Sequence, residues 1–338
     1  MTETILDINE LHTHFFTDDG EIPAVDGVSL HVNKGEIVGI VGESGCGKSV
    51  TSLSIMQLVP DPPGKIVSGN INFKGENLVK VSNKRMKKIR GKEIAMIFQE
   101  PMTSLNPLFT IGNQLRESIR IHEKMSKKDA HLKSINLLKL VGLPRAEEVI
   151  NEYPHQLSGG MRQRVMIAMA MACEPELLIA DEPTTALDVT IQAQILDLMR
   201  KLNADKNTAI LLITHDLGVV AEMCDRVIVM YAGQVVEEGT VREVLKDPKH
   251  PYTKGLIRSL PRLDEKNQKL YSIRGTVPRP KMGRTGCRFA PRCEFALNRC
   301  VKENPDLYTL ENNRLSRCFL HDELKGEKTK NGKATIGS

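Results

Sequence analysis

The sequence predicts an α/β protein with a largely parallel central sheet and an inserted helical subdomain. Two observations predict this class. Short continuous apolar runs of the buried-strand type alternate with helical patterns, and these runs cover residues 36–41, 94–98, 177–180, 209–214 and 227–231. From about residue 103 to 175 the pattern becomes helical, which places the inserted helical subdomain there.

The first forty residues predict short strands joined by turns. Apolar runs at 5–8 and 11–16 precede a turn at residues 18–20, and another run follows at 25–32. A further strand pair is expected within residues 65–80. The chain therefore begins with antiparallel β-strands.

Two helices can be placed in more detail. Ser126 is suited to cap a helix that ends at Gly142, and residues 190–202 predict a second, amphipathic helix. The apolar residues expected near one face of the first helix are Leu132, Ile135, Leu138 and Val141. After about residue 240, strand and helix periodicity both fade.

The last third of the chain differs in composition from the rest. Residues 239–338 carry 22 Lys and Arg against 11 Asp and Glu, whereas the whole chain has a net charge of +5. Four of the seven cysteines also lie there. We therefore expect a main domain at 1–240, a small loop-rich C-terminal domain with four cysteines at 241–325, and a disordered tail at 326–338.

Composition excludes several classes of protein. Hydrophobic residues make up 40% and charged residues 26% of the 338 residues, which excludes a collagen-like or wholly disordered chain. No apolar run reaches the 18 or more residues that a membrane-spanning helix needs. The first ten residues are acidic and lack the apolar region of a signal peptide. We expect a cytosolic protein that does not itself cross the membrane.

A glycine-rich loop directly follows the apolar run 36–41 and precedes a helical pattern. Its sequence fits G-x-x-x-x-G-K-[ST] with the residues Gly42, Glu43, Ser44, Gly45, Cys46, Gly47, Lys48 and Ser49. The glycines allow backbone N–H groups to form an anion-binding nest, and the helix dipole favours phosphate. We expect Lys48 to reach the β- and γ-phosphates of a nucleotide and Ser49 to bind Mg²⁺. The alternative, a simple glycine-rich turn, explains neither the preceding strand nor the following helix.

Two acidic residues follow a second buried strand. Asp181 and Glu182 end the run 177–180, at the strand edge where open α/β sheets bind ligands. We expect Asp181 to hold Mg²⁺ and Glu182 to act as the general base toward an attacking water. Acids often end strands for no functional reason, so this interpretation depends on the phosphate loop.

A second set of exposed N–H donors is expected at Ser158, Gly159 and Gly160, which begin the helical run after Leu157. The segment LSGGMRQR resembles the signature loop of the ATP-binding-cassette (ABC) ATPases. That resemblance implies an ABC cassette of the P-loop, RecA-like class. It also assigns further residues: Gln99 as the glutamine that senses Mg²⁺ and water, Asp188 in the loop after the acidic pair, and His215 as the residue that contacts the γ-phosphate. Phe15 best matches the aromatic residue that stacks on adenine, with Phe16 as the alternative.

The resemblance also implies how such a chain works. Two cassettes sandwich ATP between the loop 42–49 of one and residues 158–160 of the other, and hydrolysis reopens the pair. The sequence leaves open whether the second cassette is an identical chain or a homologue. Because Glu182 and His215 are both present, we expect a hydrolysing site.

Three further segments resemble the ATPase subunits of bacterial and archaeal oligopeptide/dipeptide importers. They are QEPMTSLNP at 99–107, VLKDPKHPYTKGLIRSLPR at 244–262 and GCRFAPRCEFALNRC at 286–300. Membership of that family implies a second ATPase, two transmembrane permease subunits and an external solute-binding protein. It places the chain on the cytoplasmic face of a prokaryotic membrane, with nickel or another solute as the alternative cargo.

The late cysteines are Cys287, Cys293, Cys300 and Cys318. Their spacing matches neither paired C-x₂-C zinc sites nor ferredoxins, and disulfides are not expected in a reducing cytosol. Four unrelated thiols remain one interpretation, and a metal site is the other. Because some members of the resembled family carry a [4Fe–4S] cluster on such cysteines, the resemblance favours that cluster, with Zn²⁺ as the alternative.

Two other functions compete with transport. A soluble ABC ATPase acting on nucleic acid would explain the basic C-terminal third, but such proteins usually carry two fused cassettes or a long coiled-coil insertion, and we expect no nucleic acid partner. A P-loop kinase would have no use for the signature loop at 157–164.

Overall fold

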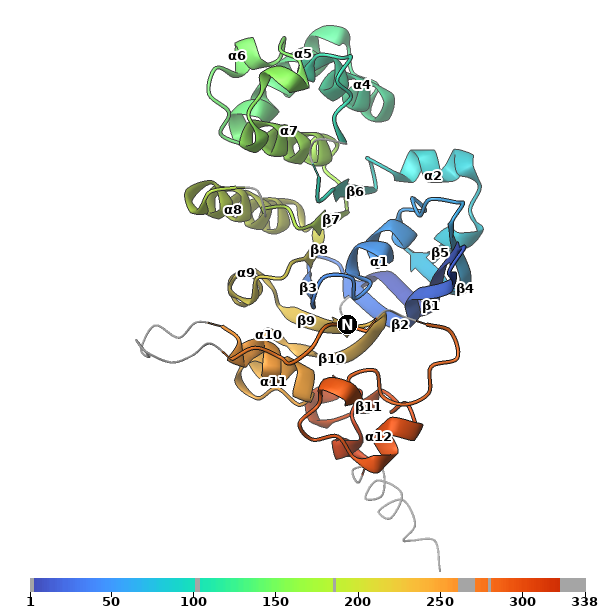
Figure 1. Cartoon of the computed structure of the whole chain (residues 1–338). Helices are drawn as coiled ribbons and strands as arrows, with labels where there is room; N and C mark the ends of the chain where they lie inside the picture. Colours follow the sequence, from blue (N-terminus) through green and yellow to red (C-terminus); the bar gives the residue numbers. More distant parts are fainter. Residues whose placement is uncertain (1–2, 101–103, 185–186, 261–270, 279–280, 323–338) are drawn as a thin grey trace, which may run out of the picture.

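The computed structural model describes residues 3–100, 104–184, 187–260, 271–278 and 281–322. Figure 1 shows three tiers along the molecule. A group of helices lies at one end, two β-sheets form the middle, and the C-terminal segment lies at the other end. The predicted tail at 326–338 falls outside the described residues, as does the first residue of the predicted helical subdomain.

The central sheet has the strand order β11-β12-β10-β9-β3-β8-β7-β6. Its parallel part consists of β6 (Ile94–Ile97), β7 (Leu177–Asp181), β8 (Ala209–Ile213), β3 (Ile37–Val41) and β9 (Arg226–Tyr231). Every residue of β3, β6, β7 and β8 is buried, which is why these strands are continuous apolar runs in the sequence. The predicted parallel α/β core is confirmed.

The N-terminal sheet is antiparallel, as predicted, with the order β2-β1-β4-β5. It is formed by β1 (Thr4–Thr17), β2 (Gly20–Asn33), β4 (Gly64–Phe73) and β5 (Glu76–Asn77). The prediction of separate strands at 5–8 and 11–16 is wrong, because β1 runs through both. A bulge between Ile8 and Leu11, with Glu10 at a φ of 46°, interrupts the apolar alternation without ending the strand.

In the described residues, the tier beyond β6 contains the helices α4 (Ile111–Glu123), α5 (Lys127–Leu140), α6 (Ala146–Val149) and α7 (Gly159–Met171). The Ser126 hydroxyl caps α5 by accepting a hydrogen bond from the N–H of Asp129, as the sequence predicts. The predicted apolar face is wrong at Leu132, which is 51% exposed while Leu138 and Val141 are buried. At 100° per residue, positions 132 and 141 lie on opposite sides of a helix.

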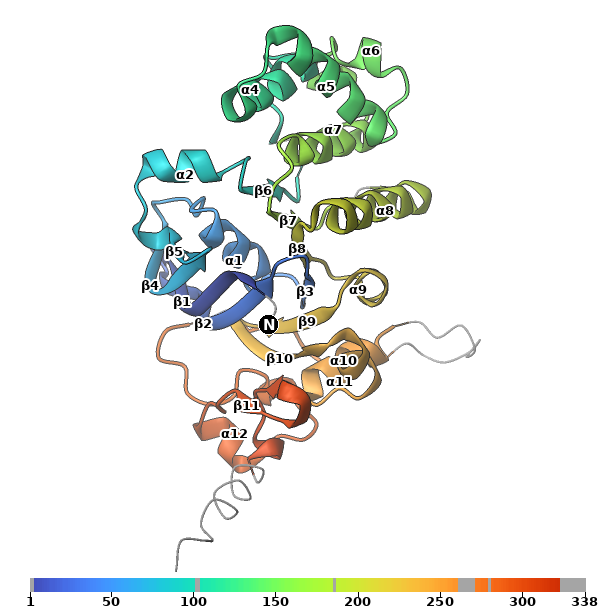
Figure 2. The same cartoon turned by 180° about the vertical axis from the view of Figure 1, so that it is seen from behind.

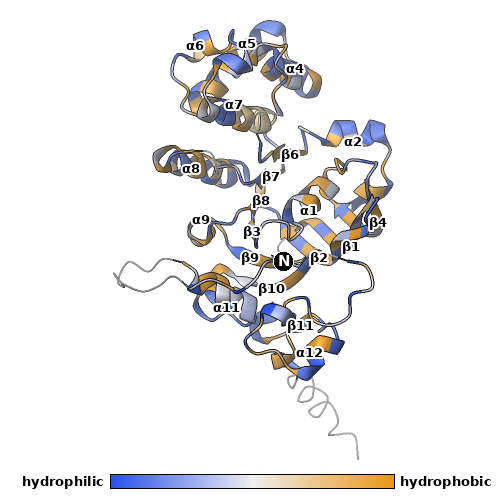
Figure 3. Cartoon of the chain, viewed as in Figure 1, coloured by the Kyte–Doolittle hydropathy of each residue, from blue (hydrophilic) through white to orange (hydrophobic). Residues whose placement is uncertain are grey.

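Five helices pack around the sheets: α1 (Lys48–Ile55), α2 (Asn83–Ile89), α8 (Val189–Lys206), α9 (Leu217–Met223) and α10 (Val241–Lys246). Figure 2 shows the molecule from the reverse side, with α8 and α9, the helices that follow β7 and β8 in the chain. In Figure 3 the surface helix α2 is mainly hydrophilic, in contrast to the apolar strand β9. No helix in the described ranges combines the length and the hydrophobicity that a bilayer crossing requires.

The C-terminal segment contains more regular structure than the sequence suggests. After β10 (Gln234–Thr240) and α10 come α11 (Pro251–Arg258), α12 (Asn298–Lys302), β11 (Tyr308–Thr309) and β12 (Leu315–Ser316). The fading periodicity concealed α10 and α11, although a Thr240–Glu243 capping box and Pro251 at the first helical turn mark their starts. β12 pairs with β10, so the segment extends the central sheet.

Candidate nucleotide-binding site

The phosphate loop connects β3 to α1 and depends on its glycines. Gly42, Gly45 and Gly47 have φ values of 155°, 77° and 104°. A Cβ on Gly42 would lie 2.3 Å from the Met230 carbonyl oxygen, and one on Gly47 would lie 2.6 Å from a backbone oxygen of β2. The loop therefore lies too close to neighbouring backbone for any larger residue at these two positions.

Lys48 begins α1 and points back into the loop. Its side chain is buried, and Nζ donates to the carbonyl oxygens of Gly42 at 2.7 Å and Glu43 at 3.1 Å. The Cys46 thiol lies 3.8 Å from the same Nζ. Burial raises the pKa of Cys46, so this thiol stays protonated at neutral pH. The arrangement concentrates one positive charge and the loop N–H groups in one place.

Asp181 lies at the end of β7 and is 3% exposed. Its carboxylate is hydrogen-bonded to the Ser49 side chain, and its Oδ1 has no hydrogen-bond partner among the described residues. Burial raises the pKa of Asp181, and the charge of Glu182 adds to this effect. A buried carboxylate oxygen beside a hydroxyl is the donor set that Mg²⁺ takes together with nucleotide phosphates. The residues present therefore fit the Mg²⁺ that ATP chemistry requires.

Three predicted residues meet at the carboxyl ends of adjacent parallel strands. Gln99 follows β6, Glu182 follows β7 and His215 follows β8. The Gln99 amide Nε2 donates to Glu182 Oε2 at 3.1 Å, and His215 Nδ1 lies 3.3 Å from Glu182 Oε1. The structure thus brings all three together around one carboxylate. Glu182 has a φ of 49°, a left-handed conformation that costs a non-glycine residue about 1 kcal/mol.

The signature segment starts α7, and Asp188 starts α8. The Ser158 hydroxyl accepts from the N–H of Met161 at 3.3 Å, and the Asp188 carboxylate accepts from the N–H of Ile191 at 3.0 Å. Ser158 and Gly159 are exposed, and a Cβ on Gly159 would meet nothing within 4 Å. This helix start is therefore open to an incoming group.

One residue of this region escaped the sequence analysis. Gln163 of α7 is 1% exposed and donates from Nε2 to the Pro183 carbonyl oxygen at 2.6 Å. It thereby connects the signature helix to the segment immediately after Glu182. The only local signal was its place in LSGGMRQR, which does not reveal a contact twenty residues away.

The two aromatic candidates lie at the end of β1. Phe15 is partly buried, and its ring packs over Gly64, where a Cβ would lie 2.9 Å from the ring. Phe16 is 49% exposed. The neighbouring Thr13 hydroxyl is 2.8 Å from the Ser54 hydroxyl, which connects this strand to α1. Either ring is available for a planar base, and the choice between them stays open.

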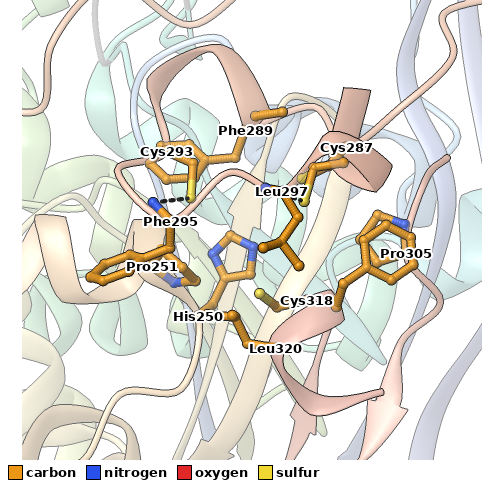
Figure 4. Close-up of a pocket in the computed structure, with 13 residues that line it drawn as sticks. His250, Pro251, Cys287, Phe289, Cys293, Phe295, Leu297, Pro305, Cys318 and Leu320 are labelled. Atoms are coloured by element: carbon orange, nitrogen blue, oxygen red, sulfur yellow. Dashed lines mark hydrogen bonds between the residues drawn. The ribbon is translucent and has the colours of Figure 1, made fainter. Parts of the chain in front are cut away.

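The four late cysteines line one pocket (Figure 4). Backbone N–H groups point at two of the sulfurs: those of Phe295 and Leu297 donate to Cys293 and Cys300 at 3.4 Å each. The backbone N–H groups of Phe289 and Ala290 near Cys287, and of Leu320 near Cys318, act to lower the pKa of these two thiols. Burial raises the pKa of Cys318 to about 11, and the charges of the other three thiols add to this effect.

The spacing of these sulfurs bears on the ion they can hold. Among the described residues, no three of the four thiols lie within 4.8 Å of one another. A single tetrahedral Zn²⁺ with Zn–S bonds of about 2.3 Å needs sulfurs about 3.8 Å apart. As they lie, the described thiols are therefore not gathered as closely as one tetrahedral zinc ion requires. Backbone N–H donors to sulfur are the groups that tune iron–sulfur centres.

Comparisons with known proteins agree with this geometry. The ABC transporter family matches residues 25–185, and the oligopeptide/dipeptide transporter C-terminal region matches residues 236–300. The chain is 56% identical to the oligopeptide transport ATP-binding protein AppD of Bacillus subtilis (strain 168), over 96% of this chain and 99% of that protein. It is 50% identical to the dipeptide transport ATP-binding protein DppD of the same organism, over 95% and 96%.

Among solved structures, the chain is similar to a dimeric post-hydrolysis state of the ATP-binding cassette MJ0796 bound to ADP and Pi. The TM-score is 0.65 and the identity 29%, with 70% of this chain and 99% of that chain covered. The fold and the site define an ATPase of the ABC class. More particularly, the chain belongs to the family of oligopeptide/dipeptide ABC transporter ATP-binding proteins.

Proposed function

We propose that the chain is the ATP-hydrolysing subunit that energises import of dipeptides or oligopeptides through an ABC transporter. The observation that carries the ATPase part is the position of Glu182 between Gln99 and His215, next to Asp181 and Ser49. The C-terminal match and the two Bacillus relatives support peptides as the cargo. No residue of this chain is expected to touch the cargo.

The residues divide the chemistry among them. Lys48 and the N–H groups of the loop 42–49 bind the phosphates, and Asp181 with Ser49 would hold Mg²⁺, which would neutralise phosphate charge. Glu182 orients the attacking water and accepts its proton. Gln99 and His215 fix the two oxygens of that carboxylate, and His215 also reaches the γ-phosphate.

The sandwich needs a second cassette. Ser158 and Gly159 present an exposed helix start, with Gly160 half-buried behind them, and the similar MJ0796 cassette is a dimer. We infer that these residues and Asp188 contact the ATP held by a partner ATPase. Two permease subunits and an external solute-binding protein complete the transporter, which places this chain at the cytoplasmic face of the membrane.

Reconstitution tests this function. The chain is assembled in liposomes with the partner ATPase and permease subunits of its own organism's importer. ATP hydrolysis that rises on adding peptide-loaded binding protein, together with uptake of labelled peptide, is the expected result. Stimulation by nickel but not by peptide would transfer the proposal to the alternative cargo. Absence of ATP hydrolysis in the wild-type assembly would reject the ATPase assignment.

We also propose that Cys287, Cys293, Cys300 and Cys318 hold a [4Fe–4S] cluster with a structural role. The N–H donors to Cys293 and Cys300, and the fact that no three of the described thiols lie within 4.8 Å of one another, support this choice over Zn²⁺. Anaerobically purified protein should contain iron and acid-labile sulfide near four each per chain. Stoichiometric zinc in the purified protein would show that the cysteines hold zinc and not a cluster. Absence of any metal would show that they are four ordinary thiols.

A further inference from the structure

Each of the four cysteines has an arginine as its neighbour in the chain. The pairs are Cys287-Arg288, Arg292-Cys293, Arg299-Cys300 and Arg317-Cys318. They all lie in residues 281–322, which we call the cysteine module. Three of the arginines reach out of the module to the main body of the protein, and one stays inside it.

The contacts of these arginines show which of them reach the main body and which one stays within the module. Arg288 donates to the Ala232 carbonyl oxygen and to Asp26 of β2, and Arg317 donates to the Val235 carbonyl oxygen at 2.8 Å. Arg299 instead pairs with Glu303 and Asp322 and lies 4.1 Å over the Phe319 ring, all within the module.

Arg292 contacts the phosphate loop itself. Its Nη1 lies 2.9 Å from Oε1 of Glu43, and its Nη2 lies 3.1 Å from Oε2, a two-point pair with the second residue of the loop. The Arg292 side chain is 5% exposed, and Nε donates to the Arg274 carbonyl oxygen at 2.9 Å. Such a planar fork fixes the direction of a carboxylate and not only its distance.

The backbone of Glu43 is held from the same side. Its N–H donates to the hydroxyl of Tyr252 at 2.9 Å, and Tyr252 is fully buried. The Tyr252 ring packs against Phe289 of the module, with ring centroids 5.4 Å apart. The Glu43 carbonyl oxygen in turn accepts from Lys48 Nζ. A shift of the module therefore displaces Glu43 and, through it, the cation that receives the phosphates.

We propose that Arg292 is a positioning residue that couples the cysteine module to the ATP site: the module holds the phosphate loop in its nucleotide-binding shape through the Arg292–Glu43 pair. The inference rests on the proposed ATP site and deepens it. Arg292 and Cys293 are adjacent in the chain, so a change at Cys293 that displaces this backbone also displaces Arg292. By reciprocity, bound ATP makes the module harder to disrupt.

The experiment measures the Kd of a fluorescent ATP analogue for full-length protein. Arg292→Ala should weaken binding about tenfold, within the usual range of coupling between sites. Arg299→Ala is the matched control, because it removes an arginine beside a cysteine without touching the main body, and it should change Kd less than twofold. Arg292→Lys keeps the charge but loses the fork, and should fall between the two.

A double-mutant cycle separates positioning from general destabilisation. Glu43→Gln alone should weaken binding about as much as Arg292→Ala, and the double variant should be no weaker than either. Cys293→Ser should weaken binding in the wild type and have no further effect in Arg292→Ala.

Three results would overturn the inference: equal losses in Arg292→Ala and Arg299→Ala, additive losses in the cycle, or unchanged binding in Arg292→Ala. In each case wild-type ATP binding would still support the ATPase assignment, whereas wild-type protein that binds no ATP analogue would reject the ATPase assignment itself.

Discussion

Two regions of the molecule hold their functional groups by different physical means. One is formed by the carboxyl ends of the buried strands β3 and β7, and the other is the cysteine module beside β10. The phosphate loop and the Glu182 carboxylate follow strands in which every residue is buried, so apolar burial fixes the strand ends from which both extend. The cysteine module has a small core of its own, formed by Cys300, Tyr308, Leu310 and Phe319 with a few partly buried neighbours. It is attached to the main body by apolar packing of Phe289 against Tyr231 and Tyr252 and also by ion pairs and carbonyl contacts of arginines. Substitutions in the buried strands and substitutions in the cysteine module should therefore affect different parts of the protein.

The largest expected effect is the loss of ATP hydrolysis when Glu182 is changed. Glu182→Gln should lower ATP hydrolysis by about 10²–10⁴-fold, the usual contribution of a general base, while ATP affinity is retained and the ATP-bound dimer accumulates. Phosphate release and equilibrium binding measure the two quantities. In the absence of nucleotide, the thiols should react with a maleimide probe at the wild-type rate. Steady phosphate release would exclude Glu182 as the base.

Replacing a buried apolar side chain with alanine should affect the central sheet and the cysteine module differently. Leu211→Ala in β8 removes a fully buried side chain and should cost about 2–5 kcal/mol of global stability. Phe319→Ala should instead raise hydrogen exchange only in the cysteine module and its contacts. Hydrogen-exchange mass spectrometry with thermal unfolding measures both. Loss of protection in β3 and β8 of the Phe319 variant would show that the module is part of the main cooperative unit.

An ion pair at the base of β3 tests the polar side of the comparison. Arg226 binds Glu36 at 2.9 Å, and both side chains are mostly buried. Burial alone would raise the pKa of Glu36, but the Arg226 guanidinium and the Asn33 N–H hold it below its usual value. The stability that this pair contributes is therefore present above the ordinary glutamate pKa and is lost as the pH falls through the lowered value.

Glu36→Gln should consequently cost about 1–3 kcal/mol at neutral pH and much less in acid. Tm measured as a function of pH tests this, with the exposed Glu303→Gln as a control that leaves the profile unchanged. A variant whose loss of Tm is the same at every pH would show that Glu36 acts through shape and not through charge.

The smallest effect is expected at a cysteine outside the module. Cys46 is buried in the phosphate loop, and its sulfur contacts Lys48 Nζ, a contact that a serine hydroxyl can replace. Cys46→Ser should change ATP affinity by less than about threefold, since one weak hydrogen bond is exchanged for another. Metal content should stay at the wild-type level, whereas Cys318→Ser should lose it. A fall in metal content in Cys46→Ser would contradict the proposed ligand set.

Much of the fold was predictable because its signals are local. The strands β3, β7 and β8 are apolar runs, and the phosphate loop carries its pattern in eight consecutive residues. The roles expected of Gln99 and His215 came from the resemblance to ABC ATPases, whereas their meeting with Glu182 depends on β6, β7 and β8 being neighbours, an order that the apolar runs do not report. The Leu132 error arose from judging a helical face by spacing alone, without the accumulated rotation.

The contact of Arg292 with Glu43 was not predictable in the same way. The two residues are 249 positions apart, and neither lies in a pattern that requires the other. The same holds for Tyr252 and for the pairing of β12 with β10. Such contacts arise from how the C-terminal segment folds back onto the sheet, which periodicity does not report.

The pairing of β12 with β10 has one more consequence. Without it, β10 would present unpaired N–H and C=O groups at Glu237 and Glu238 on the sheet edge, where another chain's strand could add. The pairing ends instead in two strands of two residues each, β12 and β11, which are too short to recruit a further strand. By covering part of this sheet edge, the C-terminal segment leaves fewer groups with which another chain's strand can pair. This effect on aggregation does not depend on ATP, peptide or metal.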